Sequence, residues 1–106
     1  MEEEMTRHTQ LVRDRGICVG IPTYNNHASI QKVVEDTLCY CDDVIVVADG
    51  CTDGTMKILG HISGITLVAY PHNKGKGHAL KVGFKKALDM GFAYAITLDA
   101  EGQHYA

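Results

Sequence analysis

The sequence predicts an α/β fold with a mainly parallel, four-stranded sheet between two layers of helices. Four short apolar runs recur along the chain, and each has the length of a buried strand. The segments between these runs repeat their apolar residues at the spacing of one helix face. Strands that alternate with helices form parallel sheets covered by helices, so we expect a Rossmann-like, three-layer α/β/α arrangement.

The composition fits a single folded domain. The chain has 106 residues, of which 45% are hydrophobic and 22% charged, so a disordered or repetitive chain is excluded. The net charge of −3 gives no general attraction to nucleic acid, and no apolar run is long enough for a membrane helix. The N-terminus is polar, and none of the four cysteines forms a C-x-x-C pair. We therefore expect reduced, mostly buried cysteines and a cytoplasmic location.

The elements of the first third follow from these patterns. Residues 1–15 are polar and predict a tail, which leaves residues 16–106 as the domain. Residues 17–21 predict a buried strand that ends at Pro22. Residues 30–41 repeat apolar side chains on one face and predict a helix.

The middle of the chain predicts two further strands with a short helix between them. Residues 44–48 are apolar and β-branched throughout, as in a strand that is covered on both faces. A short helix over residues 55–61 follows, with Thr52 or Asp53 as its cap. Residues 65–70 predict the third strand.

The last predicted helix has the clearest apolar stripe in the chain. It follows a loop over residues 71–77, and Gly91 is a suitable stop. Residues 92–98 predict the fourth strand. In such a sheet, every loop that follows a strand lies at the same edge, where ligands bind.

The loop after the first strand combines an aromatic ring with two amides. Tyr24 could stack on a base, and Asn25 and Asn26 could bond its edge. Pro and Asn are also common turn residues, so a plain turn remains the alternative. In the next loop, Asp49 could accept hydrogen bonds from a base or a ribose, whereas Asp53 is expected to have a structural role.

The third loop predicts a phosphate site. Five of the ten Lys and Arg residues lie between Lys74 and Lys86, and Gly75 and Gly77 can expose backbone N–H groups before a helix. For Lys74 and Lys76, phosphate binding and simple solvation both remain open. The segment matches neither a P-loop nor a G-x-G-x-x-G fingerprint, which disfavours an NAD-dependent oxidoreductase.

Two carboxylates follow the fourth strand. Asp99 and Glu101 alternate along the chain with Gln103, so an extended segment would point all three the same way. Hard divalent ions bind such oxygens, and Mg²⁺ usually takes one or two carboxylates together with substrate phosphates.

Together the four loops resemble glycosyltransferase family 2, whose members have the GT-A fold. The segments that carry the resemblance are IPTYNN at residues 21–26, VVADGCTDGT at 46–55, NKGKG at 73–77 and LDAEGQH at 98–104. The last segment is most similar to the branch that contains dolichyl- and polyprenyl-phosphate sugar synthases. The chain departs from the family pattern at three positions. Acidic residues are usual at the positions of Ala48 and Asn26, and Asp is usual at the position of Glu101.

The resemblance implies a UDP- or GDP-sugar donor, a Mg²⁺ or Mn²⁺ ion, and transfer of the sugar with inversion. It implies that Pro22 and Tyr24 line the nucleoside pocket, that Asp49 binds the base or ribose, and that Asp99 and Glu101 hold the metal. A Gln at the position of Gln103 can join the metal in the lipid-phosphate branch. The residues expected to bind the nucleotide sugar are Pro22, Tyr24, Asn26, Asp49, Lys76 and Asp99.

In this family the general base and the acceptor site follow the metal motif, so we expect both beyond Ala106. The sequence therefore predicts a GT-A domain truncated after its metal motif, with no transfer by these residues alone. We also expect a homo-oligomer, and in a longer parent protein a location at the cytoplasmic face of a membrane. A non-catalytic, Rossmann-like module that binds a nucleotide or phosphate is the alternative.

Overall fold

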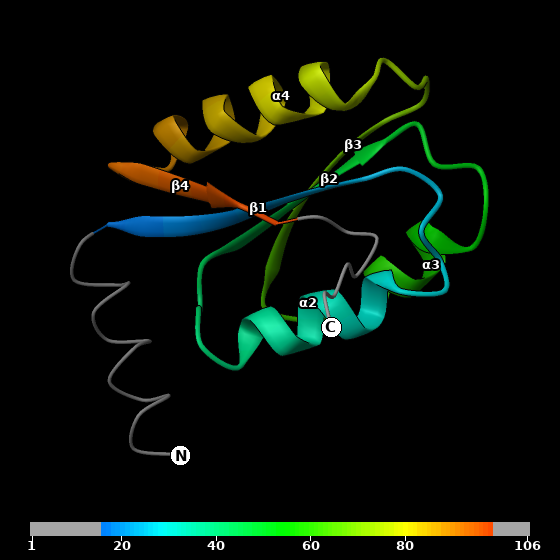
Figure 1. Ribbon diagram of the computed structural model, residues 1–106, viewed down its shortest axis with the longest axis horizontal. Coiled ribbons are helices and arrows are strands. Elements are labelled where there is room, and N and C mark those ends of the chain that lie inside the picture. Colours follow the sequence, from blue (N-terminus) through cyan, green and yellow to red (C-terminus); the bar gives the residue numbers. More distant parts are fainter. Residues whose placement is uncertain (1–15, 99–106) are drawn as a thin grey trace, which may run out of the picture.

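The computed structural model describes residues 16–98, which fold into four strands and three helices (Figure 1). In chain order these are β1 (Ile17–Thr23), α2 (Ile30–Leu38), β2 (Val44–Asp49), α3 (Thr55–Gly60), β3 (Ile65–Tyr70), α4 (Lys76–Asp89) and β4 (Tyr94–Thr97). The strands form one parallel sheet in the order β3-β2-β1-β4. The predicted α/β class, the parallel sheet and the order of elements are confirmed.

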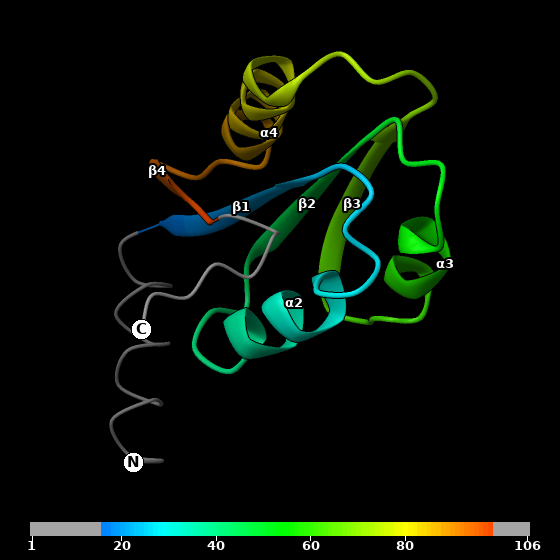
Figure 2. The same ribbon diagram turned by 45° about the vertical axis from the view of Figure 1, so that its right-hand side comes forward.

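Helices cover both faces of the sheet, as Figures 1 and 2 show: α4 lies on one face and α2 and α3 lie on the other. Two apolar clusters fill these layers. The cluster on the α2 and α3 side contains Ile21, Val46 and Leu59, and the cluster on the α4 side contains Ile45, Val47 and Ala87. All six residues of β2 are buried, because apolar side chains leave this strand toward both layers.

Strand β1 runs two residues further than the sequence predicts and includes Pro22. The N–H of Val19 donates to Asp43 on the β2 side, so the missing N–H of Pro22, three residues later, would point to the β4 side. Pairing with β4 ends at Gly20, which means that Pro22 interrupts no ladder hydrogen bond.

Helix α4 begins at Lys76, inside the segment that the sequence predicts as a loop. Gly75 has φ 95°, a conformation that L side chains rarely adopt, and it turns the chain directly into the helix. Lys76 is therefore part of the first helical turn. Within residues 16–98, no helix is long and apolar enough to span a membrane.

The four cysteines all lie in the described segment, and none forms a disulfide. Cys18 and Cys41 are buried, Cys51 is half-buried and Cys39 is exposed. Burial raises the pKa of the Cys18, Cys41 and Cys51 thiols. The expectation of free thiols is confirmed, and that of burial holds fully for Cys18 and Cys41, in part for Cys51 and not for Cys39. The predicted tail over residues 1–15 lies outside the described segment.

Candidate functional site

The loops that follow β1, β2 and β3 enclose a pocket of about 230 Å³ at the carboxyl edge of the sheet. Its lining residues are Pro22, Thr23, Tyr24, Asn26, Asp49, Asn73, Gly75, Lys76 and Ala79. Five of the six residues predicted to bind a nucleotide sugar line this one pocket. The sixth, Asp99, lies outside the described residues.

The loop after β1 presents a ring and one amide group. The Oδ1 atom of Asn26 accepts hydrogen bonds from the Thr23 hydroxyl at 2.8 Å and the Tyr24 backbone N–H at 3.1 Å. These bonds fix the orientation of the amide and leave its Nδ2 group without a partner among residues 16–98. The Tyr24 side chain is 47% exposed, so its ring is open to a ligand.

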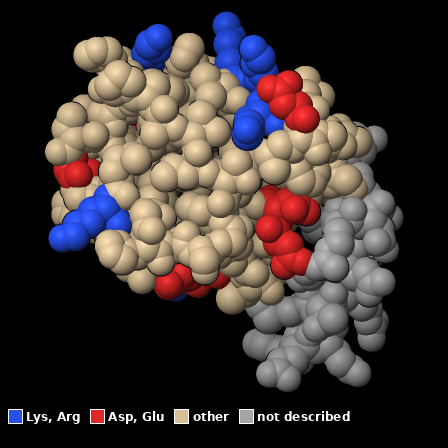
Figure 3. Space-filling view, turned by 180° about the vertical axis from the view of Figure 1, so that it is seen from behind, with Lys and Arg blue, Asp and Glu red and all other residues tan. Residues whose placement is uncertain are grey.

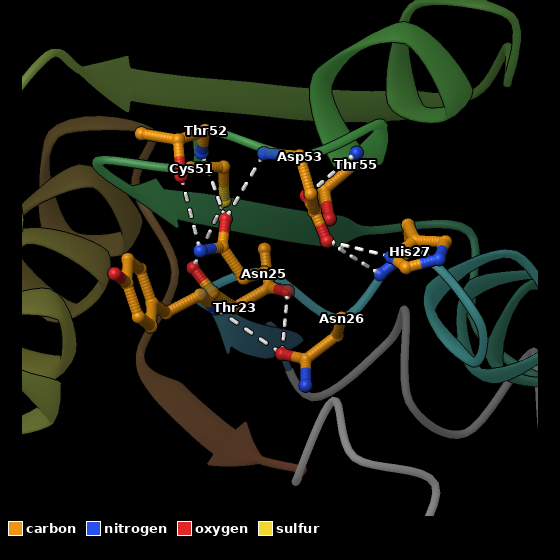
Figure 4. Close-up of polar contacts among 9 residues, drawn as sticks. Thr23, Asn25, Asn26, His27, Cys51, Thr52, Asp53 and Thr55 are labelled. Carbon is orange, nitrogen blue, oxygen red and sulfur yellow. Dashed lines mark hydrogen bonds and ion pairs between the residues drawn. The ribbon is translucent and has the colours of Figure 1, made fainter.

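Asn25 links this loop to the loop after β2 and does not line the pocket (Figure 4). Its Oδ1 atom accepts from the backbone N–H groups of Thr52 and Asp53, at 2.7 and 3.2 Å, and its Nδ2 group donates to the Thr52 hydroxyl. Asn25 has φ 53°, which Asn tolerates better than most residues. The interpretation of Asn25 as a base-binding amide is wrong, because both ends of its side chain are used between the loops.

Asp53 closes the turn before α3. Its carboxylate accepts from the Thr55 N–H at 2.9 Å and from the His27 backbone N–H at 3.3 Å, and it pairs with the His27 ring at 2.8 Å (Figure 4). Partial burial opposes ionisation, but the hydrogen bonds from Thr55 and His27 outweigh it and hold the pKa of Asp53 well below its ordinary value. The structural role predicted for Asp53 is confirmed, although the N-cap position itself is Gly54 and Thr52 caps nothing.

Asp49 holds the loop between β3 and α4. Its Oδ1 atom accepts from the Lys74 N–H at 2.8 Å, and its Oδ2 atom accepts from the Gly75 N–H at 3.0 Å and the Asn73 side-chain amide at 2.9 Å. The residue is only 2% exposed. A carboxylate has about four acceptor positions, so Asp49 keeps room for one further donor.

Gly50 allows this loop to pack directly on the end of β2. It has φ 68°, and a Cβ atom at this position would lie 2.2 Å from the backbone nitrogen of Asn73. Any larger residue would therefore displace the loop that Asp49 holds. The sequence contains this glycine, but the residue it packs against, Asn73, comes 23 positions later. The close approach could therefore not be inferred from the local pattern.

Lysine side chains lie along α4, the helix whose first turn borders the pocket. In Figure 3, Lys and Arg side chains cluster along the edge of the molecule where α4 lies. Lys76 is exposed, lines the pocket and forms no ion pair within the described segment. The first turn of α4 adds unpaired N–H groups at the same end, so this side of the pocket suits an anion.

Tyr70 does not line the pocket but neighbours Asp49, a relationship that sequence reasoning missed. Its hydroxyl oxygen is buried and has no hydrogen-bond partner among residues 16–98. Its ring meets the ring of His78 edge-on, with the centroids 5.4 Å apart. Burial, and then the neighbouring Asp49 carboxylate, raise the pKa of the Tyr70 hydroxyl, which keeps it a neutral hydrogen-bond donor.

The model of glycosyl transferase family 2 matches residues 18–106. The chain belongs to this family. The family 2 domain therefore includes every loop described above, and it includes the segment of Asp99, Glu101 and Gln103, whose predicted metal site lies outside the described residues. Within residues 16–98, no group of three His, Cys, Asp or Glu side chains could hold a metal ion.

Curated relatives of this family 2 chain include enzymes that act on lipid phosphates. A UDP-N-acetylglucosamine–dolichyl-phosphate N-acetylglucosaminyltransferase of Methanococcus voltae is 32% identical over 86% of this chain and 43% of its own length. An undecaprenyl-phosphate 4-deoxy-4-formamido-L-arabinose transferase of Pectobacterium carotovorum is 30% identical over 85% of this chain and 30% of its own length. The chain thus spans less than half the length of these relatives.

A solved structure supports the GT-A fold for this family 2 chain. Glucosyl-3-phosphoglycerate synthase from Mycobacterium tuberculosis, in complex with Mn²⁺, UDP and glucosyl-3-phosphoglycerate, superposes with a TM-score of 0.67. The match has 24% sequence identity and covers 91% of this chain and 37% of that one. The predicted Rossmann-like GT-A architecture is confirmed.

Proposed function

We propose that this chain binds the donor of a glycosyltransferase that moves a sugar from a nucleoside diphosphate sugar to a polyprenyl-phosphate acceptor. One observation carries the proposal: an aromatic ring, an amide, a carboxylate and a lysine line a single pocket at the carboxyl edge of a parallel sheet. Membership of family 2 and the relatives that act on lipid phosphates support the same activity.

Each part of the pocket suits one part of such a donor. The exposed ring of Tyr24 offers a stacking surface for the base, and the Nδ2 group of Asn26, which has no partner among residues 16–98, can donate to a base carbonyl. Asp49 has one acceptor position left for an N–H or a ribose hydroxyl. Lys76, with the first turn of α4, would contact the diphosphate.

The proposal includes a divalent ion, Mg²⁺ or Mn²⁺, held by Asp99, Glu101 and Gln103. Two carboxylates and an amide oxygen form a donor set that suits a hard cation. Such an ion acts as a Lewis acid that neutralises charge on a leaving nucleoside diphosphate. Leu98, the last described residue, follows β4 and donates its N–H to the Gly20 carbonyl of the neighbouring strand β1 at 3.0 Å.

We also propose that copies of the chain associate and that the protein works at the cytoplasmic face of a membrane. Phe84, Leu88 and Ile96 expose large apolar side chains, with Leu88 71% exposed, and such surfaces favour association. The free cysteines fit a reducing compartment. Gel filtration tests whether copies of the chain associate, and the elution volume of a monomer would contradict this association.

Isothermal titration of UDP and GDP, each with and without Mn²⁺, tests the donor site. We expect one nucleotide to bind, and the Tyr24→Ala and Lys76→Ala variants to weaken its binding about tenfold each, in line with a lost stacking or charged contact. Lys81→Ala, a change at an exposed lysine further along α4, is the matched control and should bind as the wild type does. Absence of binding by both nucleotides would overturn the proposal.

The alternative function, a binding module without chemistry, predicts a different result for the metal motif. In a glycosyltransferase, Asp99→Ala should abolish the effect of Mn²⁺ on nucleotide affinity. An affinity that is the same with and without the substitution would favour the module. We expect no sugar transfer by the 106-residue chain alone, and turnover measured with it would contradict this expectation.

A further inference from the structure

We propose that Asp49 is a positioning residue, which fixes the loop over residues 71–75 and so directs Lys76 into the pocket. The resemblance to family 2 implies a direct contact between Asp49 and the base or ribose. The hydrogen bonds of Asp49 point to an additional role that does not need a ligand. Only the consequence for phosphate binding rests on the proposed function.

The carboxylate is committed to the loop before any ligand arrives. Three hydrogen bonds of 2.8 to 3.0 Å reach it from Asn73, Lys74 and Gly75, and both of its oxygens take part. Its backbone carbonyl accepts a further bond from the Asn73 amide at 3.2 Å. At 2% exposure, the carboxylate offers a ligand no more than its one remaining acceptor position.

The loop has few other attachments in the described part of the chain. The side chains of residues 71–74 are exposed, so burial contributes little to holding them. Gly50 provides the flat surface on which the Asn73 backbone rests, but it offers no hydrogen bond to the loop. The position of the loop therefore depends mainly on the carboxylate of Asp49.

The hydrogen bond that Gly75 donates to Asp49 is made one residue before Lys76. Gly75 donates to Asp49 and, at φ 95°, sets the direction in which α4 begins. A displaced Gly75 would move the Lys76 backbone and with it the ammonium group at the pocket wall. Asp49 can thus influence phosphate binding without touching a phosphate.

Amide hydrogen exchange of the ligand-free chain tests the positioning role directly. In Asp49→Asn, an NH₂ group replaces one carboxylate oxygen. This group cannot accept the hydrogen bond that a backbone N–H of the loop donates to that oxygen. We expect the Lys74 and Gly75 amides to exchange about tenfold faster, as for the loss of one hydrogen bond. The amide of Ile45, in the buried strand β2, reports on global unfolding and should not change.

Asn73→Ala separates positioning from direct contact, because it removes both hydrogen bonds of the Asn73 side chain to Asp49 and leaves the Asp49 carboxylate in place. NMR titrations with inorganic pyrophosphate and with uridine provide the second readout. We expect both variants to weaken pyrophosphate binding, Asp49→Asn about tenfold and Asn73→Ala about threefold, because Asp49→Asn also removes the negative charge that strengthens each hydrogen bond to the loop. Asn73→Ala should weaken pyrophosphate binding more than uridine binding, and Lys81→Ala should change neither.

Unchanged exchange of the Lys74 and Gly75 amides in Asp49→Asn would overturn the positioning role. So would a loss of uridine binding in Asp49→Asn with pyrophosphate binding intact, since a direct base contact alone gives that result. If the wild type binds neither probe, the proposed function fails, and the exchange rates alone then decide whether Asp49 holds the loop.

Discussion

The Oδ1 atom of Asn25 lies 2.7 Å from the backbone nitrogen of Thr52, a residue 27 positions later in the chain. Asp49, at the start of the same second loop, binds Lys74 and Gly75 in the third loop. Two short polar side chains thus connect the three loops that line the pocket. A site assembled in this way is formed before ligand binding, which reduces the entropy lost when a ligand binds.

Substitution of Asn25 should destabilise the fold through two separable causes. Asn25→Ala removes three hydrogen bonds and places Ala at φ 53°, so we expect a loss of about 2–3 kcal/mol in the free energy of unfolding. Asn25→Gly removes the same bonds but tolerates the backbone angle, and it should be about 1 kcal/mol less destabilising. Urea denaturation measures both losses. An Asn25→Ala variant that is as stable as the wild type would contradict the role of Asn25 in linking the two loops.

Gly50 should be far less tolerant of substitution than the other glycines of the site. Gly50→Ala puts a methyl group 2.2 Å from the Asn73 nitrogen at a positive φ, so we expect a loss of about 2–4 kcal/mol. Gly75→Ala also has a positive φ, but no atom lies within 4 Å of the new methyl, and about 1 kcal/mol is expected. Gly20→Ala meets neither obstacle and should be close to neutral in thermal unfolding. Equal losses at Gly50 and Gly75 would show that the close approach is unimportant.

Because the pKa of Asp53 is lowered in the folded state, part of the free energy of unfolding depends on pH. The folded-state pKa lies below the unfolded value, so the stabilisation is present above about pH 4 and is lost as the pH falls through the folded pKa. Asp53→Asn lacks this contribution at every pH. We therefore expect the wild type to be more stable than Asp53→Asn at pH 7, and the difference to shrink below pH 4 in urea titrations. A difference that stays constant with pH would contradict the role of the ionised Asp53 carboxylate as a hydrogen-bond acceptor.

The four thiols should differ widely in reactivity. Cys39 is exposed, whereas Cys18 and Cys41 are fully buried and burial raises their pKa. A thiol reagent such as Ellman's should modify Cys39 in the folded protein and reach Cys18 and Cys41 only on unfolding. The Cys39→Ser variant, in which the fast phase should disappear, provides the control.

The fold could be predicted in nearly all its elements because its signals are local. The run at Val44–Ala48 is apolar on both faces, and only a strand covered by two layers allows this. The ends of the elements were less certain. Pro22 stays in β1 because its neighbour β4 pairs no further than Gly20, and that depends on strand order rather than on the local sequence.

The lining of the site was predictable, but the contacts that shape it were not. The carboxyl edge of a parallel sheet collects its loops, so Tyr24, Asp49 and Lys76 were expected together. Asn25 and Asn26 are adjacent and chemically identical, yet one links two loops and the other lines the pocket. Nothing in the sequence distinguishes them, because the difference depends on backbone direction at a single turn.

Strand β2 ends in the loop to which both neighbouring loops are attached, and it is the strand with every residue buried. A Cβ atom at Gly83 of α4 would lie 3.4 Å from the Val47 side chain, so the helix packs closely on this strand, and we expect a change in packing around Val47 to affect Asp49 two residues later. Ligand affinity and resistance to unfolding should therefore vary together across variants of this strand. A library of β2 variants that is screened only for heat tolerance would then also be enriched in variants that keep the shape of the pocket.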